Sequence, residues 1–302
     1  MSKKAYTLND RKRTLKVVEP YLWIAPSLIL MSIFIIVPIF TVFRMAFSQV
    51  SKTGRIRGFA GFENFADVMN NPEFTKVLSN TVVWTILVVA LSTILGFILA
   101  LLLNNEFRGR KIARAIVVFP WATTLVIQAS VWNFIINKDY GTLNTLLKTL
   151  GIIQSNINWT PSPQAYFAWE IACGIFVTIP FVCFTVLSGL QSIDASYYEA
   201  ATVDGANYWQ KLFRITLPLV KNSLTVSTVL NIIYVFNSFP IIWTMTKGDP
   251  AYQTDTLVTY LYKLAFYNGK QGEAAAVSVI GFTILLVCAS VYMVSTLKKG
   301  DE

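Results

Sequence analysis

Six long apolar runs restrict this chain to folds that span a membrane. They lie near residues 21–43, 80–103, 112–136, 166–188, 219–245 and 274–297. Each is long enough to cross a bilayer as a helix, which takes about 20 residues. Because lipid offers the backbone no hydrogen-bond partners, a helix satisfies its own peptide groups there. We therefore expect an all-α, polytopic membrane protein with six transmembrane helices.

The distribution of Lys and Arg sets the expected orientation of these helices. The segments rich in basic residues are 1–20, 104–114, 189–222 and 298–302, and they alternate with 44–79, 137–165 and 246–273. Basic residues are about twice as dense in the first group, which the positive-inside rule places in the cytoplasm. We expect cytoplasmic N and C termini, a cytoplasmic segment at 1–20 and a single transmembrane domain at 21–302.

The chain lacks the residue patterns of a catalytic or metal-binding protein. It has no histidine, and its three cysteines all lie inside apolar runs with no spacing typical of a metal site. No phosphate-loop pattern G-x-x-x-x-G-K-[ST] occurs. We therefore expect no enzyme activity and no cofactor in this chain. The net charge of +9 is explained by membrane orientation, so no nucleic-acid partner is expected.

The longest polar segment in the apolar second half of the chain is 197–218. Ser196 and Glu199 have the spacing of a capping box, and Asp194 can cap the helix instead. Gly205 offers the left-handed conformation that ends a helix. The segment is therefore predicted to form two short helices with a break between them.

The second of these helices can begin at Asn207, a residue type favoured at helix starts. Its apolar residues Trp209, Leu212 and Phe213 recur at i, i+3 and i+4, which predicts one shared apolar face. Leu217 and Pro218 are expected to end it.

Seven positions in this segment resemble the EAA loop of ABC importer permeases. They are Glu199, Ala200, Ala201, Gly205, Ile215, Leu217 and Pro218. The sequences GFENF at 61–65 and NPEF at 71–74, placed before the second span, resemble the carbohydrate-uptake branch with its maltose- and glycerol-phosphate-type permeases. The resemblance implies the type I ABC importer permease fold and a multi-pass location in a prokaryotic cell (inner) membrane.

In that family the EAA loop, here 191–218, couples the permease to a separate ATPase. The implied coupling residues are Glu199, Ala200, Ala201, Asp204, Gly205, Leu217 and Pro218. Glu199 and Ala200 would face the ATPase, Ala201 would permit close approach, and Gly205 would set the angle between the two helices. The implied partners are a second homologous permease, two ATPase subunits that bind ATP and Mg, a sugar, and an extracytoplasmic solute-binding protein. This last partner would dock on outer loops that include 137–165 and 246–273.

The fifth span carries the polar residues best suited to line a solute path. Asn231, Tyr234 and Ser238 lie at i, i+3 and i+7 and share a helix face, with Asn237 beside them. Such groups suit a polyhydroxylated ligand, but they serve equally well in hydrogen bonds between helices. Similarity to maltose-transporter-type permeases implies ligand-facing positions at Gly174, Val177, Thr178, Phe181, Asn231, Tyr234 and Val235. The lack of an amide at Gly174 and Val235 argues against maltose itself.

Two further interpretations concern residues near the ends of spans. Glu170 is interpreted as a solvated boundary residue, with substrate lining or helix packing as the alternative. The tryptophans Trp23, Trp84, Trp121 and Trp243 lie near expected span ends, where interfacial belts of aromatic residues are common.

Two other functions stay open at this point. The same family also imports glycerol phosphate and other polar solutes, although the fourth and fifth spans have no basic residue between their ends. A stand-alone secondary carrier or a membrane enzyme is the other alternative. It would require buried acidic or metal-ligand residues and would leave the EAA segment unexplained.

Overall fold

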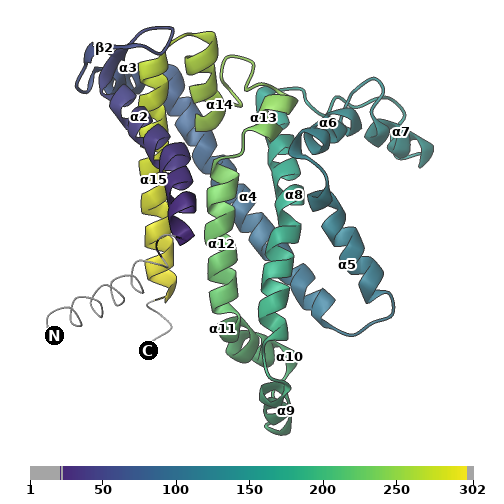
Figure 1. Ribbon diagram of the computed structural model, residues 1–302. Helices are drawn as coiled ribbons and strands as arrows, with labels where there is room; N and C mark the ends of the chain where they lie inside the picture. The colour runs from purple at the N-terminus through teal and green to yellow at the C-terminus, as the bar shows by residue number, and fades with distance from the viewer. Residues whose placement is uncertain (1–20, 22, 298–302) are drawn as a thin grey trace, which may run out of the picture.

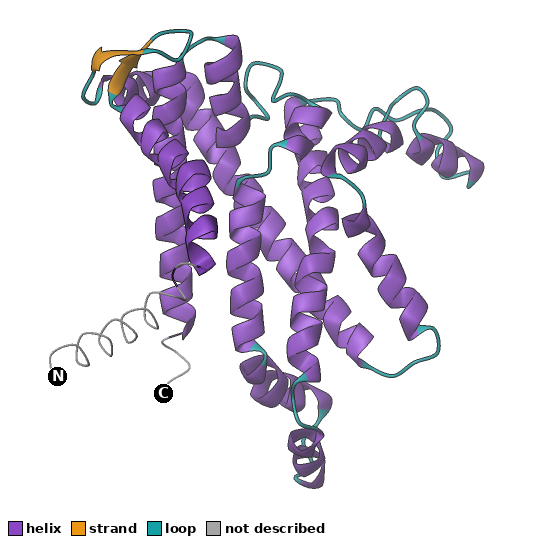
Figure 2. Ribbon diagram, viewed as in Figure 1, coloured by secondary structure: helices purple, strands orange, loops and turns teal. Residues whose placement is uncertain are grey.

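The computed structural model describes residues 21 and 23–297, and these are mostly helical (Figures 1 and 2). The predictions made for 1–20 and 298–302 fall outside the described residues. Five helices are long and apolar enough to cross a membrane: Trp23–Ala46, Pro72–Asn104, Pro163–Gln191, Lys221–Met245 and Gln271–Val294. Five of the six predicted spans are therefore confirmed, although Lys221–Met245 consists of two helices, Lys221–Phe236 and Pro240–Met245.

The prediction of one continuous helix over 112–136 is wrong. The structure has two helical segments there, Arg110–Ala122 and Leu125–Ile135, bent by 99° at the break between them. Thr124 is in an extended conformation, and its hydroxyl accepts a hydrogen bond from the Ile127 N–H. A threonine in this position starts a new helix. The third predicted span is therefore a bent pair of helical segments.

The described helices and strands have the following bounds in chain order. The first half holds η1 (Ser32–Ile36), α2 (Val37–Ala46), β1 (Ser48–Val50), β2 (Ile56–Phe59), α3 (Glu63–Asn70), α4 (Pro72–Asn104), α5 (Arg110–Val118), η2 (Phe119–Ala122), α6 (Leu125–Ile135) and α7 (Thr142–Thr149). The second half holds α8 (Pro163–Gln191), α9 (Ala195–Val203), α10 (Tyr208–Lys211), η3 (Leu212–Thr216), α11 (Leu217–Leu219), α12 (Lys221–Phe236), α13 (Pro240–Met245), α14 (Leu257–Tyr262), η4 (Lys263–Tyr267) and α15 (Gln271–Leu297).

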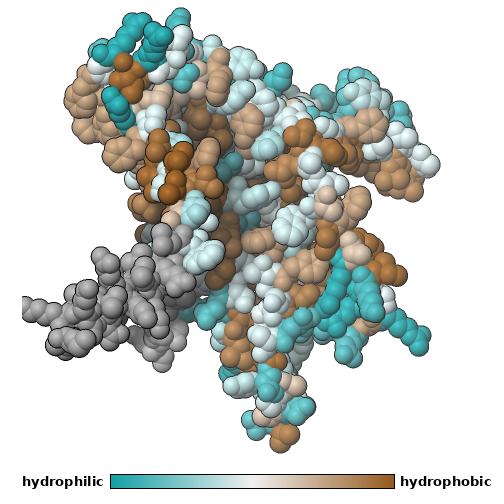
Figure 3. Space-filling model, viewed as in Figure 1, coloured by the Kyte–Doolittle hydropathy of each residue, from teal (hydrophilic) through white to brown (hydrophobic). Residues whose placement is uncertain are grey.

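The strands β1 and β2 form an antiparallel hairpin that the sequence did not predict. It lies in the loop before α4, at the end of the molecule opposite to α9 (Figures 1 and 2). Hydrophilic residues gather there, whereas hydrophobic residues cover much of the middle of the visible face (Figure 3). This distribution suits a body in lipid with polar ends in water.

Helices α4 and α8 form the most extensive helix–helix contact of the bundle. Gly96 permits it, because a Cβ there would lie 2.8 Å from the Cβ of Val182. Trp84 of α4 is 1% exposed, so its interpretation as an interfacial residue is wrong. Its indole Nε1 donates to the Val235 carbonyl over 2.9 Å, which ties α4 to α12. An indole N–H in an apolar core needs such a partner.

Helices α2 and α15 pack together beside this core (Figure 1). The apolar stretch of the first span, Trp23–Ala46, buries almost none of its side chains against the rest of the chain. Among the described residues, the first span therefore lies at the periphery of the bundle.

Candidate functional site

The first helix of the EAA segment, α9, is capped by Asp194. Its carboxylate accepts a hydrogen bond of 2.8 Å from the Ser196 backbone N–H. This bond lowers the pKa of Asp194. The cap is thus the second of the two predicted possibilities, and the Ser196–Glu199 box is not formed. Gly205 follows the helix with φ +75°, as predicted for the break.

The second helix begins with the capping box of Asn207 and Gln210. The Gln210 N–H donates to Asn207 Oδ1 over 2.9 Å, and the Asn207 N–H donates to Gln210 Oε1 over 2.8 Å. Two further contacts join the two helices: Lys211 Nζ donates to Thr202 Oγ1 over 2.7 Å, and the hydroxyls of Tyr198 and Thr216 lie 3.0 Å apart. Capping and cross-bonding together fix the angle between the helices.

The second helix does not end at Leu217-Pro218 as predicted, because the helical path continues through η3 and α11 to Leu219, one residue further. In the π-turn of η3 the Leu217 N–H bonds to the Leu212 carbonyl. This shift leaves Pro218 in the first turn of α11, where the missing N–H costs nothing.

The apolar face predicted for this helix is divided in the structure. Leu212 is only 9% exposed, whereas Trp209 and Phe213 are 63% and 59% exposed. Their two rings stack with centroids 6.1 Å apart. Leu212 therefore packs against the rest of the chain, and the stacked pair lies outside.

Five of the predicted coupling residues lie in or directly after α9, on the part of the chain that projects furthest from the bundle, and Leu217 and Pro218 lie on α11 at the base of α12 (Figure 1). Glu199, Ala200, Asp204, Gly205 and Pro218 are exposed, Leu217 is partly exposed, and Ala201 is 9% exposed. Large apolar side chains surround them at high exposure: Tyr197, Val203, Tyr208, Trp209 and Phe213. An exposed patch of this kind at one end of a protein marks an interaction surface.

Five of the nine predicted path residues line one hollow of ≈ 280 Å³ between α8, α12 and η2. They are Val177, Thr178, Phe181, Asn231 and Tyr234. Trp121 and Leu230 complete the lining, and none of these residues is charged. The sequence prediction missed Trp121 because this residue comes from the break in the third span.

Asn231 makes a hydrogen bond between helices, which was one of the two interpretations that the sequence left open. It is 0% exposed, and its Nδ2 donates to Ser92 Oγ of α4 over 2.8 Å. Its Oδ1 has no hydrogen-bond partner within the described part of the chain. One end of the amide therefore links two helices, and the other remains free as an acceptor.

The other four predicted path residues lie outside the hollow. A Cβ at Gly174 would lie 2.9 Å from Trp84, so this glycine is a packing position against α4. Val235 is 1% exposed and accepts the indole hydrogen bond of Trp84. Asn237 is exposed at the end of α12. Ser238 is 6% exposed and follows the last helical residue, so it does not continue the face of Asn231.

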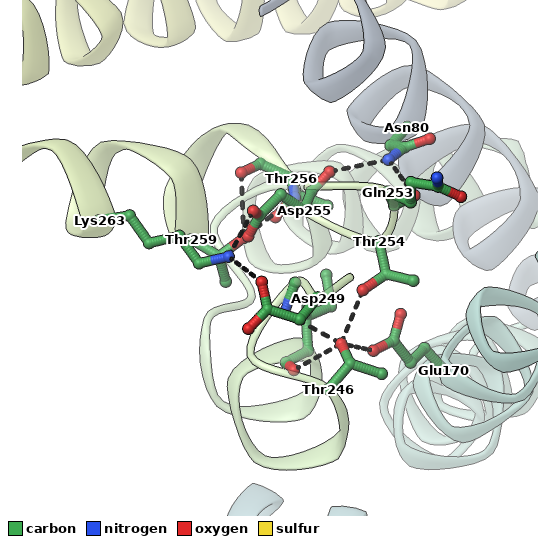
Figure 4. A network of polar contacts seen from close by, with 12 residues as sticks. Asn80, Glu170, Thr246, Asp249, Gln253, Thr254, Asp255, Thr256, Thr259 and Lys263 are labelled. Carbon is green, nitrogen blue, oxygen red and sulfur yellow. Dashed lines mark hydrogen bonds and ion pairs between the residues drawn. The ribbon is translucent and has the colours of Figure 1, made fainter. Parts of the chain in front are cut away.

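Glu170 belongs to a buried polar network at the end of the bundle opposite to α9 (Figure 4). It is 0% exposed, so the interpretation as a solvated boundary residue is wrong. Thr246 donates its hydroxyl to Glu170 Oε1 over 2.7 Å and accepts from the Gly248 N–H over 3.0 Å. Its oxygen also lies 2.7 Å from the Thr254 hydroxyl. The segment after α13 thus covers the carboxylate, which sequence spacing does not show.

The second half of the network is centred on Asp255, whose side chain is fully buried. Lys263 Nζ lies 2.8 Å from Asp255 Oδ2 and 3.2 Å from Asp249 Oδ1. Burial raises the pKa of Asp255, and its hydrogen bond to Lys263 acts in the opposite direction. Asn80 of α4 donates to the carbonyls of Gln253 and Asp255 over 2.8 and 3.1 Å. The network therefore fastens the segment after α13 to α4, α8 and α14.

Comparison with known proteins places this architecture in one family. Residues 92–297 match the model of the binding-protein-dependent transport system inner membrane component. The chain belongs to this family. A probable ABC transporter permease protein of Brucella suis biovar 1 is 45% identical over 274 residues, which cover 91% of this chain and 95% of the relative.

The names of two other relatives state the compounds that they transport. A trehalose/maltose transport system permease protein of Thermococcus litoralis is 36% identical over 90% of this chain and 92% of its own length. A sulfoquinovosyl glycerol transport system permease protein of Agrobacterium fabrum is 33% identical over 90% of this chain and 88% of its own length.

A solved structure shares the fold. The crystal structure of a bacterial ABC transporter involved in alginate import contains a chain that superposes with a TM-score of 0.83 at 24% identity. The match covers 95% of this chain and 99% of that one. The resemblance seen in the EAA segment is confirmed, and the protein is a multi-pass inner-membrane permease subunit of an ABC transporter. Such a subunit is not an enzyme in itself.

Proposed function

We propose that this permease forms the translocation path of an ATP-driven importer for a neutral sugar or oligosaccharide. The observation that carries the proposal is the hollow between α8 and α12, where amide, hydroxyl and aromatic groups meet with no charged residue. The hydroxyl of Tyr234, on a 45% exposed side chain of this hollow, can form a hydrogen bond with a sugar hydroxyl. The relative named for trehalose/maltose transport supports the same substrate class.

The size of the hollow is consistent with one side of a shared path. Its ≈ 280 Å³ lies at the lower edge of the range for ligand pockets, which is about 300–1,000 Å³. A second homologous permease facing α8 and α12 would close the path and complete the lining. The rings of Trp121, Phe181 and Tyr234 offer apolar surface for the C–H face of a sugar.

The coupling element of this proposal is the EAA loop at 191–218, docked on an ATPase that binds ATP and Mg. Two such ATPase subunits and an extracytoplasmic solute-binding protein complete the assembly. The exposed rings of Tyr208, Trp209 and Phe213 are the apolar anchors that an amphipathic helix uses in a groove. ATP drives transport in this scheme because it binds one arrangement of the subunits better than the other.

The first test is recovery of the ATPase from gently solubilised membranes. Wild type is compared with Glu199→Lys/Gly205→Asp, and Lys148→Glu on exposed α7 serves as the matched charge reversal at the other end of the molecule. We expect to recover the ATPase with wild type and with the control, and to recover little with the double variant. Equal recovery from these three proteins would refute the coupling assignment.

The single variant Gly205→Asp tests coupling directly. Gly205 has open space around it, so this variant should insert normally but uncouple ATP hydrolysis from uptake.

The substrate class is tested separately by uptake into cells that carry the complete system. The probes are labelled glucose, trehalose, maltotriose and glycerol 3-phosphate. Tyr234→Ala, at a 45% exposed position, should lower sugar uptake without changing ATPase recovery. Uptake of glycerol 3-phosphate in place of every sugar would overturn the neutral-sugar proposal. Uptake that needs no ATPase would favour a stand-alone carrier.

A further inference from the structure

Five aromatic rings gather at the end of the fifth span that lies opposite to the EAA loop. Phe239 and Trp243 stack at 5.1 Å with an interplanar angle of 20°. Tyr262 lies 4.9 Å from Phe239 and 4.8 Å from Trp243. Phe266 lies 4.8 Å from Tyr262, and Tyr267 lies 5.9 Å from Trp243. We call these five residues the aromatic cluster.

The aromatic cluster follows the hollow-lining part of α12 closely along the chain. Tyr234 lines the hollow and is 45% exposed. Asn237 follows at i+3, is exposed, and lies about 4.5 Å further along the helix axis. Phe239 comes next, directly before α13. Exposed Tyr234 and Asn237 and partly exposed Phe239 thus lie between the hollow and this end of the fifth span along the chain.

The cluster differs from the interfacial belt that its tryptophan suggested in the sequence. Belt residues place their amphipathic rings at the level of the lipid headgroups. Here the rings contact one another across two separate elements, α13 and the α14–η4 segment. Phe266 and Tyr267 are still 71% and 68% exposed, so the cluster presents open ring surface beside its inner contacts.

The chemistry of the cluster suits an uncharged sugar. An aromatic face is electron-rich and attracts the C–H face of a pyranose, and tyrosine hydroxyls can bond its hydroxyl groups. The adjacent cation, Lys263, is engaged by Asp249 and Asp255 at 3.2 and 2.8 Å. The cluster is therefore flanked by a charge that is already paired, which disfavours an anionic ligand.

We propose that the aromatic cluster is a second sugar subsite, which holds the units of an oligosaccharide that the hollow does not hold. This inference rests on the proposed function, because it assumes sugar import through the hollow. It adds a chain-length preference: longer sugars contact both sites, and a monosaccharide depends on the hollow.

The test compares Trp243→Leu and Tyr262→Leu with Trp243→Phe, which keeps a ring, and with Phe59→Leu. Phe59 is an 81% exposed ring on β2, outside the cluster. Uptake of labelled maltotriose, trehalose and glucose is measured in cells with the complete system, at equal amounts of assembled complex. We expect the two leucine variants in the cluster to lower maltotriose uptake about 3- to 10-fold relative to glucose uptake. Trp243→Phe and Phe59→Leu should retain the wild-type ratio.

Several results would overturn the inference. They are an equal loss for all three sugars, the same loss in Phe59→Leu, or a wild type that imports only monosaccharides. Failure of the proposed function has a different signature, since wild type would then take up none of the sugars. If Tyr234→Ala lowers sugar uptake while Trp243→Leu changes nothing, the hollow stands and the second subsite is refuted.

Discussion

Replacement of Thr246 by valine should destabilise the protein strongly, although the two side chains have the same shape. The Thr246 hydroxyl donates to Glu170 Oε1 over 2.7 Å and accepts from the Gly248 N–H over 3.0 Å. It also lies 2.7 Å from the Thr254 hydroxyl. Valine removes all of these contacts at once and creates no cavity.

The magnitude follows from the groups left without a partner. Glu170 already has one oxygen, Oε2, that finds no partner among the described residues, so the variant leaves both carboxylate oxygens unsatisfied. A buried polar group that loses its hydrogen bond costs about 1–3 kcal/mol. With the carboxylate and the Gly248 N–H both affected, we expect Thr246→Val to lower the free energy of unfolding by about 2–5 kcal/mol.

The assay is unfolding of the purified permease in mixed micelles of dodecyl maltoside and increasing amounts of SDS. Thr246→Ser keeps the hydroxyl and should lose less than about 1.5 kcal/mol. Thr283→Val removes an exposed hydroxyl that bonds only within its own helix, and it should change the free energy of unfolding by less than about 0.5 kcal/mol. The reasoning is refuted if Thr246→Val is as stable as Thr246→Ser.

A double variant separates the hydrogen bond from other effects. Replacing both partners of a buried bond by apolar groups is often nearly neutral, whereas removing one partner is costly. Glu170→Leu/Thr246→Val should therefore be more stable than the sum of the two single changes predicts. Simple additivity would mean that the two side chains are not coupled.

Three other substitutions test local features of the fold. Gly248→Ala should prevent accumulation of folded protein, measured by detergent size-exclusion chromatography, because φ is +81° and the new Cβ would clash with the Asp255 carboxylate; normal yield would contradict this. Gly174→Val should cost about 1–3 kcal/mol in the SDS assay through overpacking against Trp84, and a neutral result would place the residue outside that contact. Asn207→Ala should cost about 1 kcal/mol in the same assay and weaken ATPase recovery, and unchanged recovery would show that the cap does not position the coupling surface.

Features that depend on neighbouring residues in the chain could be predicted from the sequence. Five spans were found because a long apolar run has few stable alternatives to a helix in lipid. The break at Gly205 and the cap at Asn207 were also found, since each depends on one residue type at one backbone position. The family resemblance in the EAA segment was also visible, because it depends on residue types at fixed spacings along the chain.

The bend in the third span was missed because hydropathy does not report it. Its two segments read as one apolar run, and the break depends on Thr124 acting as a cap where α6 turns away from α5. A threonine inside an apolar run is equally compatible with a continuous helix, which bonds its hydroxyl back to the preceding turn. Contacts with α8 and α13 are available only after folding, and they accompany the turned position of α6.

The sequence by itself determined the membrane class, most of the spans and the location of the EAA segment, because these follow from local composition and spacing. Only the tertiary structure decided which polar residues are buried and which line the hollow. Glu170 and Trp84 looked like boundary residues, yet segments far away in the chain cover them. Asn231 and Val235 lie on the same helix, and α4 packs against both, so both side chains are buried. Of these two residues, Asn231 keeps an acceptor oxygen without a partner among the described residues. Burial is set by the packing of helices that are far apart in the chain, and the spacing of residues along the sequence does not show which helices come into contact.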